Sequence, residues 1–319
     1  MQRMLRTTAV MVGATGATVG AAYGVLTQQG RRARRNIVIP GWCPFRADGV
    51  YLPDGTGPHP PSAVALPVPA LDVVHLAMLG DSLAAGLGVD GPEHLPGVVL
   101  ARGLAKDADR PVQLDTLASC GCTSRRLSGQ VDLALSDPPR VAVIMIGAND
   151  VTRRVPPWES AKLLGEAVSR LRAIGTTVIV GTCPDLGTIR PIPQPLRALA
   201  HTSSLTLARL QRDAVYRAGG LVVPLAQLLA HDFLTQPETM FSRDHYHPSS
   251  AGYDAACTVL LPALCSALRG SALPDEGGNT ETDPVTPAGM TGSVRAGWLA
   301  TRFGNTTTAA ESPGTARPG

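Results

Sequence analysis

Aromatic residues make up only 4% of this 319-residue chain, and lysine occurs at two positions, Lys106 and Lys162. So few aromatic rings argue against a groove that stacks sugars or nucleic-acid bases. Charged residues are also sparse, at 17%, whereas hydrophobic residues reach 44%. This balance excludes a wholly disordered chain, and the length is sufficient for one large or two small domains with a full hydrophobic core.

The chain also lacks a basic body. Its formal net charge of +3 comes from 28 basic and 25 acidic residues. Residues 1–35 hold six arginines and no acid, so the rest of the chain has 22 basic and 25 acidic residues and a net charge of −3. Nucleic-acid binding requires Lys and Arg clustered on a basic surface. We therefore predict that the protein has no nucleic-acid partner.

The sequence contains no C-x-x-C pair, which argues against a zinc site. Cys120 and Cys122 have one residue between them and are not suited to a disulfide with each other. The same holds for Cys257 and Cys265, which are about 12 Å apart on one predicted helix. Disulfides to other partners and reduced, buried thiols both remain compatible with the sequence. The six cysteines are Cys43, Cys120, Cys122, Cys183, Cys257 and Cys265.

The N-terminal 35 residues form a distinct segment. Residues 7–30 carry no charge and follow two arginines, which predicts a signal or anchor segment at 1–35 and an exported or envelope-associated protein. The arginines of residues 31–35 favour cytoplasmic retention by the positive-inside rule. An uncleaved N-terminal helix on a cytoplasmic protein is therefore the alternative.

Residues 71–269 form the predicted folded domain, between an irregular Pro/Gly-rich connector at 36–70 and a disordered tail at 270–319. Apolar β-branched runs alternate with helical stretches there, which predicts a three-layer α/β/α domain around a mostly parallel sheet. The expected strands are 73–79, 112–117, 141–146, 177–181 and 221–223. The expected helices are 94–106, 124–135, 158–173, 197–218 and 250–268.

Residues with chemical potential follow the first three predicted strands. Ser82 stands in a Gly-Asp-Ser turn after the first strand, Gly121 follows the second, and Asn149 follows the third. The carboxyl ends of parallel strands meet at one edge of the sheet, where active sites collect. A serine there can act as a nucleophile, and a backbone N–H and an amide can stabilise an oxyanion. The structural alternatives are a helix cap, a turn glycine and an Asx turn.

The fourth group is Asp244, His245 and His247, just before the last predicted helix. Asp244 and His247 are three residues apart, so the carboxylate can orient the imidazole of a general base. His245 is the rival base. A metal site made by these three residues is a further alternative, although no third cluster supports it.

These four blocks, in this order, resemble the GDSL or SGNH family of serine esterases and lipases. The matching residues are Gly80-Asp81-Ser82-Leu83, Gly121, Gly147-Ala148-Asn149-Asp150 and Asp244-x-x-His247-Pro248. The resemblance spans about residues 74–266 and is greatest to mycobacterial exported GDSL-like esterases. It implies the flavodoxin-like SGNH-hydrolase fold.

The resemblance implies a carboxylic ester hydrolase without a metal or organic cofactor. Ser82 would be the nucleophile, with His247 as base and Asp244 as its partner. Ser82, Gly121 and Asn149 would form the oxyanion hole. The expected substrate is a small-molecule or lipid ester with a short- to medium-chain acyl group. Carbohydrate O-deacetylase, thioesterase, lysophospholipase and a non-catalytic envelope scaffold remain alternatives.

Residues 184–195 are rich in proline and follow the fourth predicted strand. They are expected to form either a wall of the substrate site or a rigid surface connector. Met240 and Phe241 lie beside the Asp–His turn in the sequence. They are expected to line an acyl pocket or to pack in the core.

Overall fold

A computed structural model of the protein describes residues 24–32, 43–61 and 73–270. Its centre is a six-stranded sheet in the order β1-β3-β2-β4-β5-β6. All neighbouring strands are parallel except β1, which pairs antiparallel with β3. The strands are β1 (Gly49–Tyr51), β2 (Val74–Gly80), β3 (Val112–Thr116), β4 (Val141–Met145), β5 (Thr177–Gly181) and β6 (Leu221–Val223).

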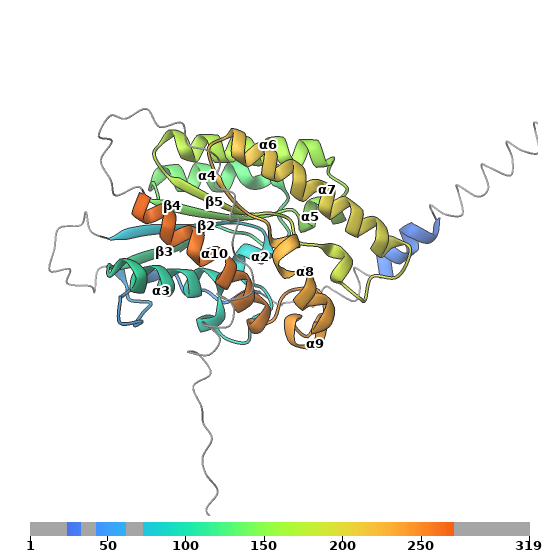
Figure 1. Ribbon diagram of the computed structural model, residues 1–319, viewed down its shortest axis with the longest axis horizontal. Helices are drawn as coiled ribbons and strands as arrows, with labels where there is room; N and C mark the ends of the chain where they lie inside the picture. Colours follow the sequence, from blue (N-terminus) through green and yellow to red (C-terminus); the bar gives the residue numbers. More distant parts are fainter. Residues whose placement is uncertain (1–23, 33–42, 62–72, 271–319) are drawn as a thin grey trace, which may run out of the picture. The chain divides into compact units, whose positions relative to one another are not determined.

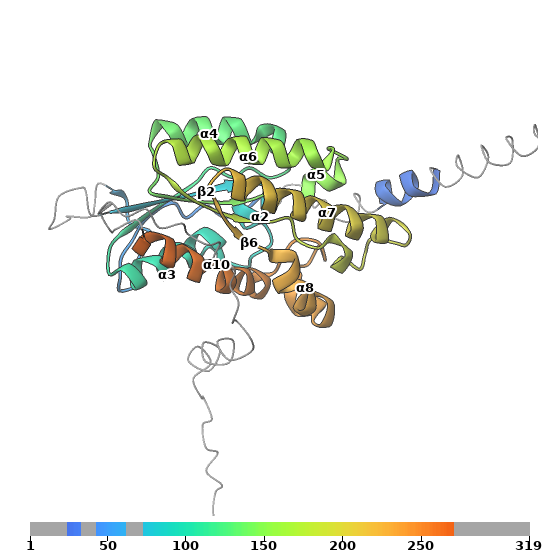
Figure 2. The same ribbon diagram turned by 45° about the horizontal axis from the view of Figure 1, so that its top comes forward.

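Helices cover both faces of this sheet (Figures 1 and 2). On one face lie α4 (Leu127–Ser136), α6 (Pro157–Ala173) and α7 (Leu196–Arg217), and on the other lie α3 (Pro96–Ala108), α8 (Leu225–Thr235) and α10 (Ser250–Gly270). Short elements at the strand ends complete the order. They are α2 (Ser82–Ala85), α5 (Ala148–Thr152), α9 (Pro237–Met240), η3 (Pro92–His94), η4 (Ser124–Arg126) and η5 (Leu186–Thr188).

Strand β4 shows why the sheet is buried on both faces. Its five residues are all buried. Val143 packs in one hydrophobic core with α3 and α10, whereas Ile144 packs in the other with α4 and α6. Successive side chains of a strand point to opposite faces, so a continuous apolar run fits a strand between two helical layers.

The predicted three-layer α/β/α fold with a mostly parallel sheet is therefore confirmed. The expectation for residues 36–70 is wrong in one respect, because part of this connector forms the edge strand β1. Three residues in a Pro/Gly-rich stretch show no periodicity, and the strand is defined by its pairing with β3. The predicted tail beyond residue 270 lies outside the described residues.

A short helix at residues 24–32 hydrogen-bonds to the folded body of residues 73–270. The Gln29 Nε2 donates to the Gln194 carbonyl at 2.7 Å, and the Gln29 Oε1 accepts the Leu196 N–H at 3.3 Å. The end of the uncharged 7–30 run is thus attached to the body, whereas residues 7–23 lie outside the described range. Of the helices that the structure describes, only α10 is long and apolar enough to span a membrane, and its Leu260 and Leu264 are buried in the core.

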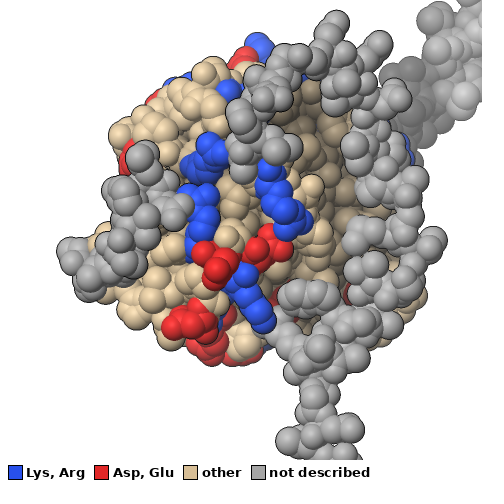
Figure 3. All heavy atoms as spheres, turned by 60° about the vertical axis from the view of Figure 1, so that its left-hand side comes forward, with Lys and Arg blue, Asp and Glu red and all other residues tan. Residues whose placement is uncertain are grey.

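Charges of both signs lie close together on the side of the molecule shown in Figure 3. Many surface ion pairs of this kind contribute only about 0–1 kcal/mol each, because water and salt screen them. This mixture on the visible face agrees with the small net charge of the body outside residues 1–35.

Candidate active site

Ser82 lies at the turn from β2 to α2. The backbone at Gly80 has a φ of +132°, a conformation that glycine adopts without steric penalty. Asp81 then caps α2, since its Oδ1 accepts the Leu83 N–H at 2.9 Å. The turn and the cap together place the Ser82 side chain, 8% exposed, at the carboxyl end of the central strand.

Ser82, His247 and Asp244 form one hydrogen-bonded chain. The distance from Ser82 Oγ to His247 Nε2 is 3.0 Å, and that from His247 Nδ1 to Asp244 Oδ2 is 2.6 Å. With Nδ1–H donated to the carboxylate, Nε2 is free to accept the serine proton. The structure therefore brings together the serine, base and carboxylate that the sequence analysis selected.

Further hydrogen bonds hold the Asp244 carboxylate. Its Oδ1 accepts the hydroxyl of Ser242 at 2.8 Å and the backbone N–H groups of Tyr246 and His247 at 2.9 Å each. Burial favours the neutral acid, but these bonds and the His247 side chain outweigh it and lower the pKa of Asp244 below its usual value. Asp244 thus remains a carboxylate that can orient His247.

His245 lies outside this chain of contacts. Its side chain is exposed, and its backbone N–H donates to the Ser242 carbonyl at 2.8 Å in a turn with φ of +52° at His245. Asp244 Oδ2 meanwhile accepts from His247. The geometry therefore favours His247 over His245 as the base and does not assemble Asp244, His245 and His247 around one ion.

The two further oxyanion candidates, Gly121 and Asn149, belong to segments that hydrogen-bond to the turn from β2 to α2. Ser119, in the loop that carries Gly121, donates its N–H to the Gly80 carbonyl at 3.1 Å. The Asn149 Nδ2 donates to Asp81 Oδ2 at 3.3 Å. Gly121 has a φ of +75°, so its backbone adopts a conformation that favours glycine.

Asp150 secures this region, a role that the sequence analysis missed. It is fully buried, and its two carboxylate oxygens accept the Ser124 N–H at 3.1 and 3.2 Å. Ser124 begins η4, three residues after Gly121, and its hydroxyl bonds to Ser160 at 2.7 Å. Burial raises the pKa of Asp150, while the hydrogen bonds of Ser124 act in the opposite direction. The signal was present in the sequence, since Asp150 directly follows Asn149 in the G-x-N-D block.

Two buried glutamines also hold strand ends, and the sequence analysis missed both. The Gln130 amide binds both backbone groups of Gly80, at 2.7 Å to the N–H and 2.8 Å to the carbonyl. The Gln211 amide joins the Cys183 N–H, at 2.7 Å, to the Ile146 carbonyl, at 2.9 Å. Each glutamine lies on the buried face of its helix, and a polar residue within an apolar stripe is the signal that could have identified it.

An apolar pocket opens beside Ser82 and His247. It includes residues 184–186 and Ile189, so part of the predicted proline-rich wall does line the site. Phe241 also lines the pocket, whereas Met240 packs against the core. Helix α8, which the sequence analysis did not predict, supplies further lining residues, namely Leu225, Leu229, Ala230 and Phe233.

The environment of Asp81 leads to a pH-dependent prediction. Burial raises the pKa of Asp81 to about 6. Because the folded state then binds the proton more tightly than the unfolded chain, the carboxylate lowers stability as the pH rises from about 4 to 6. At about 1.4 kcal/mol per pKa unit, this cost reaches roughly 3 kcal/mol at pH 7.

We therefore expect Asp81→Asn, which keeps the oxygen that caps α2, to raise the free energy of unfolding relative to wild type more at pH 7 than at pH 4. The gain relative to wild type should grow by roughly 2–3 kcal/mol between these pH values, measured by urea unfolding. Asp109→Asn, at an exposed left-handed position that asparagine tolerates, is the control and should show no comparable trend. An equal Asp81→Asn effect at both pH values would contradict the prediction.

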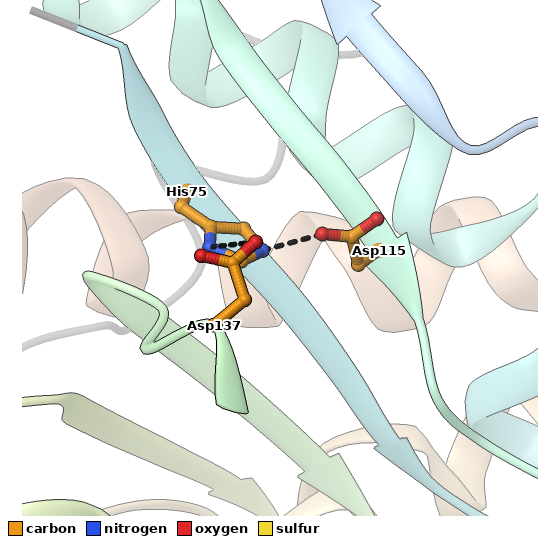
Figure 4. A group of neighbouring side chains, drawn as sticks. All are labelled: His75, Asp115 and Asp137. Carbon is orange, nitrogen blue, oxygen red and sulfur yellow. Dashed lines mark hydrogen bonds and ion pairs between the residues drawn. The ribbon is translucent and has the colours of Figure 1, made fainter. Parts of the chain in front are cut away.

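A separate group of metal-ligating residue types is made by His75 on β2, Asp115 on β3 and Asp137, which follows α4 (Figure 4). His75 Nε2 contacts Asp115 Oδ2 at 2.5 Å, and His75 Nδ1 lies 3.9 Å from Asp137 Oδ2. The hydrogen bond from His75 lowers the pKa of Asp115. The two carboxylates face different ring nitrogens of His75, and the nearer one, that of Asp115, is hydrogen-bonded to the ring.

All six cysteines lie in the described residues and all are free thiols. Cys43 and Cys120 are exposed, and the other four are buried. Although Cys120 is exposed as a residue, the surrounding loop partly desolvates its thiol and raises the pKa of Cys120 to about 11, so this thiol beside Gly121 is protonated at neutral pH.

The chain is similar to known proteins in sequence. The model of the GDSL-like lipase/acylhydrolase family matches residues 78–255. The GDSL-like esterase Rv1075c of Mycobacterium tuberculosis is 47% identical over 263 residues, which cover 82% of each chain.

The fold is also similar to that of solved structures. LAE5, an α/β hydrolase enzyme from the metagenome of Lake Arreo, Spain, has 22% identity and a TM-score of 0.49, covering 61% of this chain and 96% of that one. A lipase/acylhydrolase from Enterococcus faecalis has 19% identity and a TM-score of 0.47, covering 60% and 96%.

The family match includes the serine and asparagine blocks and extends into α10. It covers more than half of the chain, and the mycobacterial relative supports it over a still longer region. The resemblance seen in the sequence is thus confirmed, and the protein belongs to the GDSL-like lipase/acylhydrolase family and is a carboxylic ester hydrolase.

Proposed function

We propose that this protein is a serine esterase that hydrolyses esters of short- to medium-chain carboxylic acids through an acyl-enzyme on Ser82. The observation that carries the proposal is the continuous hydrogen-bonded chain from Ser82 through His247 to Asp244. A serine hydroxyl is a weak nucleophile until an adjacent base takes its proton. His247, oriented by Asp244, is placed to do so.

In this mechanism Ser82 Oγ attacks the ester carbonyl while His247 Nε2 accepts its proton. The Asn149 amide and the backbone N–H groups of Ser82 and Gly121 stabilise the negative charge on the carbonyl oxygen. The alkoxide then leaves with the proton from His247. A water molecule, activated by the same imidazole, hydrolyses the acyl-enzyme and restores Ser82.

The lining of the pocket supports an acyl chain as its occupant. Its walls are mainly aliphatic and aromatic side chains, with Phe233 and Phe241 in edge-to-face contact at 4.9 Å between ring centroids. Burying each methylene of an acyl chain there contributes about 0.8 kcal/mol. An extended apolar wall has no such role in removing acetyl groups from a carbohydrate.

The test uses the full chain, a fluorophosphonate probe and p-nitrophenyl esters of graded chain length. We expect turnover that improves from acetyl to medium-chain esters, and covalent labelling that peptide mass spectrometry assigns to Ser82. Labelling of a different serine would refute the proposed nucleophile. Absence of both labelling and turnover on every ester would favour the non-catalytic scaffold instead.

A further inference from the structure

A second recess lies across the turn η5 (Leu186–Thr188) from the acyl pocket. Leu186 lines the pocket, whereas Gly187 and Arg190 line the recess, and Asp185 lines both. The two hollows are therefore neighbours that share one wall. The other polar side chains that line the recess are Gln194, Arg197 and His201.

The cationic groups of this recess lack acidic partners. The Arg190 Nη2 donates to the Leu234 carbonyl at 2.9 Å, which orients the guanidinium without neutralising it. Arg197 is half-buried, and no carboxylate within the described part of the chain lies in ion-pair range of Arg190 or Arg197. Both guanidinium groups thus line the recess without a carboxylate partner, that of the exposed Arg190 and that of the half-buried Arg197.

The one carboxylate of the recess is already occupied. Asp185 is 8% exposed, and its Oδ1 accepts the Gly187 N–H and contacts His201 Nδ1, both at 2.7 Å. The Oδ1 of this carboxylate is therefore engaged within the protein, whereas the charged donors of Arg190 and Arg197 have no acidic partner in the recess. Donors without an acceptor, in a concave site, are suited to an oxyanion.

The rim of the recess is held in place before any ligand binds. The Gln194 side-chain oxygen accepts the Ala198 N–H at 3.2 Å, and Gln29 bonds to the backbone of Gln194 and Leu196. Because the backbone at the start of α7 is already fixed, the protein loses less conformational entropy when Arg197 binds a ligand.

We propose that this recess binds a phosphate group carried by the alcohol part of the ester substrate, so that the enzyme prefers phosphate-bearing esters. This inference rests on the proposed function, because it places the acyl chain in the pocket beside Ser82. The alcohol then extends over η5 to Arg190 and Arg197. The planar guanidinium groups match the geometry of phosphate oxygens and pair with them through charge-assisted hydrogen bonds.

The test compares two esters with the same acyl chain and the same glycerol unit. They are 1-octanoylglycerol, which is neutral, and 1-octanoylglycerol 3-phosphate, and octanoate release is measured for both. We expect wild type to prefer the phosphate ester, and Arg197→Ala and Arg190→Ala each to lower the ratio of the two kcat/KM values roughly tenfold. Rising ionic strength should also reduce the wild-type preference.

Arg209→Ala is the matched control. Arg209 is exposed on the same helix α7, two turns beyond the recess, so its removal changes the net charge equally. It should leave the ratio unchanged. An equal fall in this variant would attribute the preference to overall charge and overturn the proposal.

The remaining outcomes separate the recess from the proposed function and distinguish the sources of phosphate. An unchanged ratio in both recess variants, with octanoate still released, would overturn the recess alone. Failure of wild type to hydrolyse either ester, with no fluorophosphonate labelling, would overturn the proposed function. If the recess variants lose sedimentation with phosphatidylglycerol vesicles but keep the soluble preference, the phosphate belongs to a membrane surface and the substrate role is overturned.

Discussion

Replacing Ser82 by alanine is expected to lower kcat/KM on p-nitrophenyl esters by about 10⁴-fold or more. The substitution removes the Oγ that contacts His247 Nε2 at 3.0 Å, so that no acyl-enzyme forms. It leaves the backbone N–H of residue 82 and the Asn149 amide in place. The residual rate should therefore remain above that of the spontaneous reaction, because oxyanion stabilisation and substrate binding persist.

The measurement is initial-rate kinetics with subtraction of spontaneous hydrolysis, and the same loss should appear in fluorophosphonate labelling. Ser119→Ala is the control, since Ser119 is an exposed serine on the neighbouring loop, and it should stay within a few-fold of wild type. A Ser82→Ala enzyme that retains a tenth of the wild-type rate would show that another group forms the acyl-enzyme.

Asp244 orients His247, the proposed base for Ser82. A carboxylate held by three hydrogen bonds, two of them from backbone N–H groups, cannot rotate freely toward a competing donor. The backbone of the turn thereby fixes the carboxylate that contacts His247 Nδ1. The hydrogen-bonded chain from Ser82 thus depends on the residue 242–247 turn as a whole, which carries the proposed catalytic residues Asp244 and His247.

The central strands and the candidate site were predictable for the same reason. Strand β4 (Val141–Met145) is a continuous apolar run, and Gly147 and Asn149 follow its carboxyl end. Residues far apart in sequence, such as Ser82 and His247, meet because the topology brings the carboxyl ends of the parallel strands to one edge. Local patterns therefore sufficed to find residues whose contacts are long-range.

The features that were missed depend on partners that no local pattern reveals. Strand β1 has three residues and is defined by β3. Tyr51 within it is fully buried and has the Arg102 guanidinium 5.6 Å from its ring centroid, a contact made only after folding. Gln130 and Gln211 likewise appear in the sequence as single polar residues. Their role depends on hydrogen bonds to Gly80 and Ile146, respectively, which form only in the folded protein.

Gly80 carries the sharpest steric requirement in the site. A Cβ at this position would lie 1.9 Å from the Met145 carbonyl oxygen, on backbone that already has a φ of +132°. The Gln130 side chain hydrogen-bonds to both the N–H and the carbonyl of Gly80, and Asp81 donates its N–H to the Met145 carbonyl. The backbone at Gly80 therefore cannot shift away from an added methyl group without breaking bonds to both neighbours.

Gly80→Ala is consequently expected to destabilise the protein by roughly 4 kcal/mol, as the sum of about 1–3 kcal/mol for the strained φ and about 1–3 kcal/mol for overpacking. Urea unfolding measures this loss. The control is Gly129→Ala, because Gly129 is exposed in α4 and an added Cβ meets nothing within 4 Å. That variant should gain about 0.5–1 kcal/mol from helix propensity. If Gly80→Ala were as stable as Gly129→Ala, the close approach of β2 and β4 beneath Ser82 would not be the constraint that positions the nucleophile.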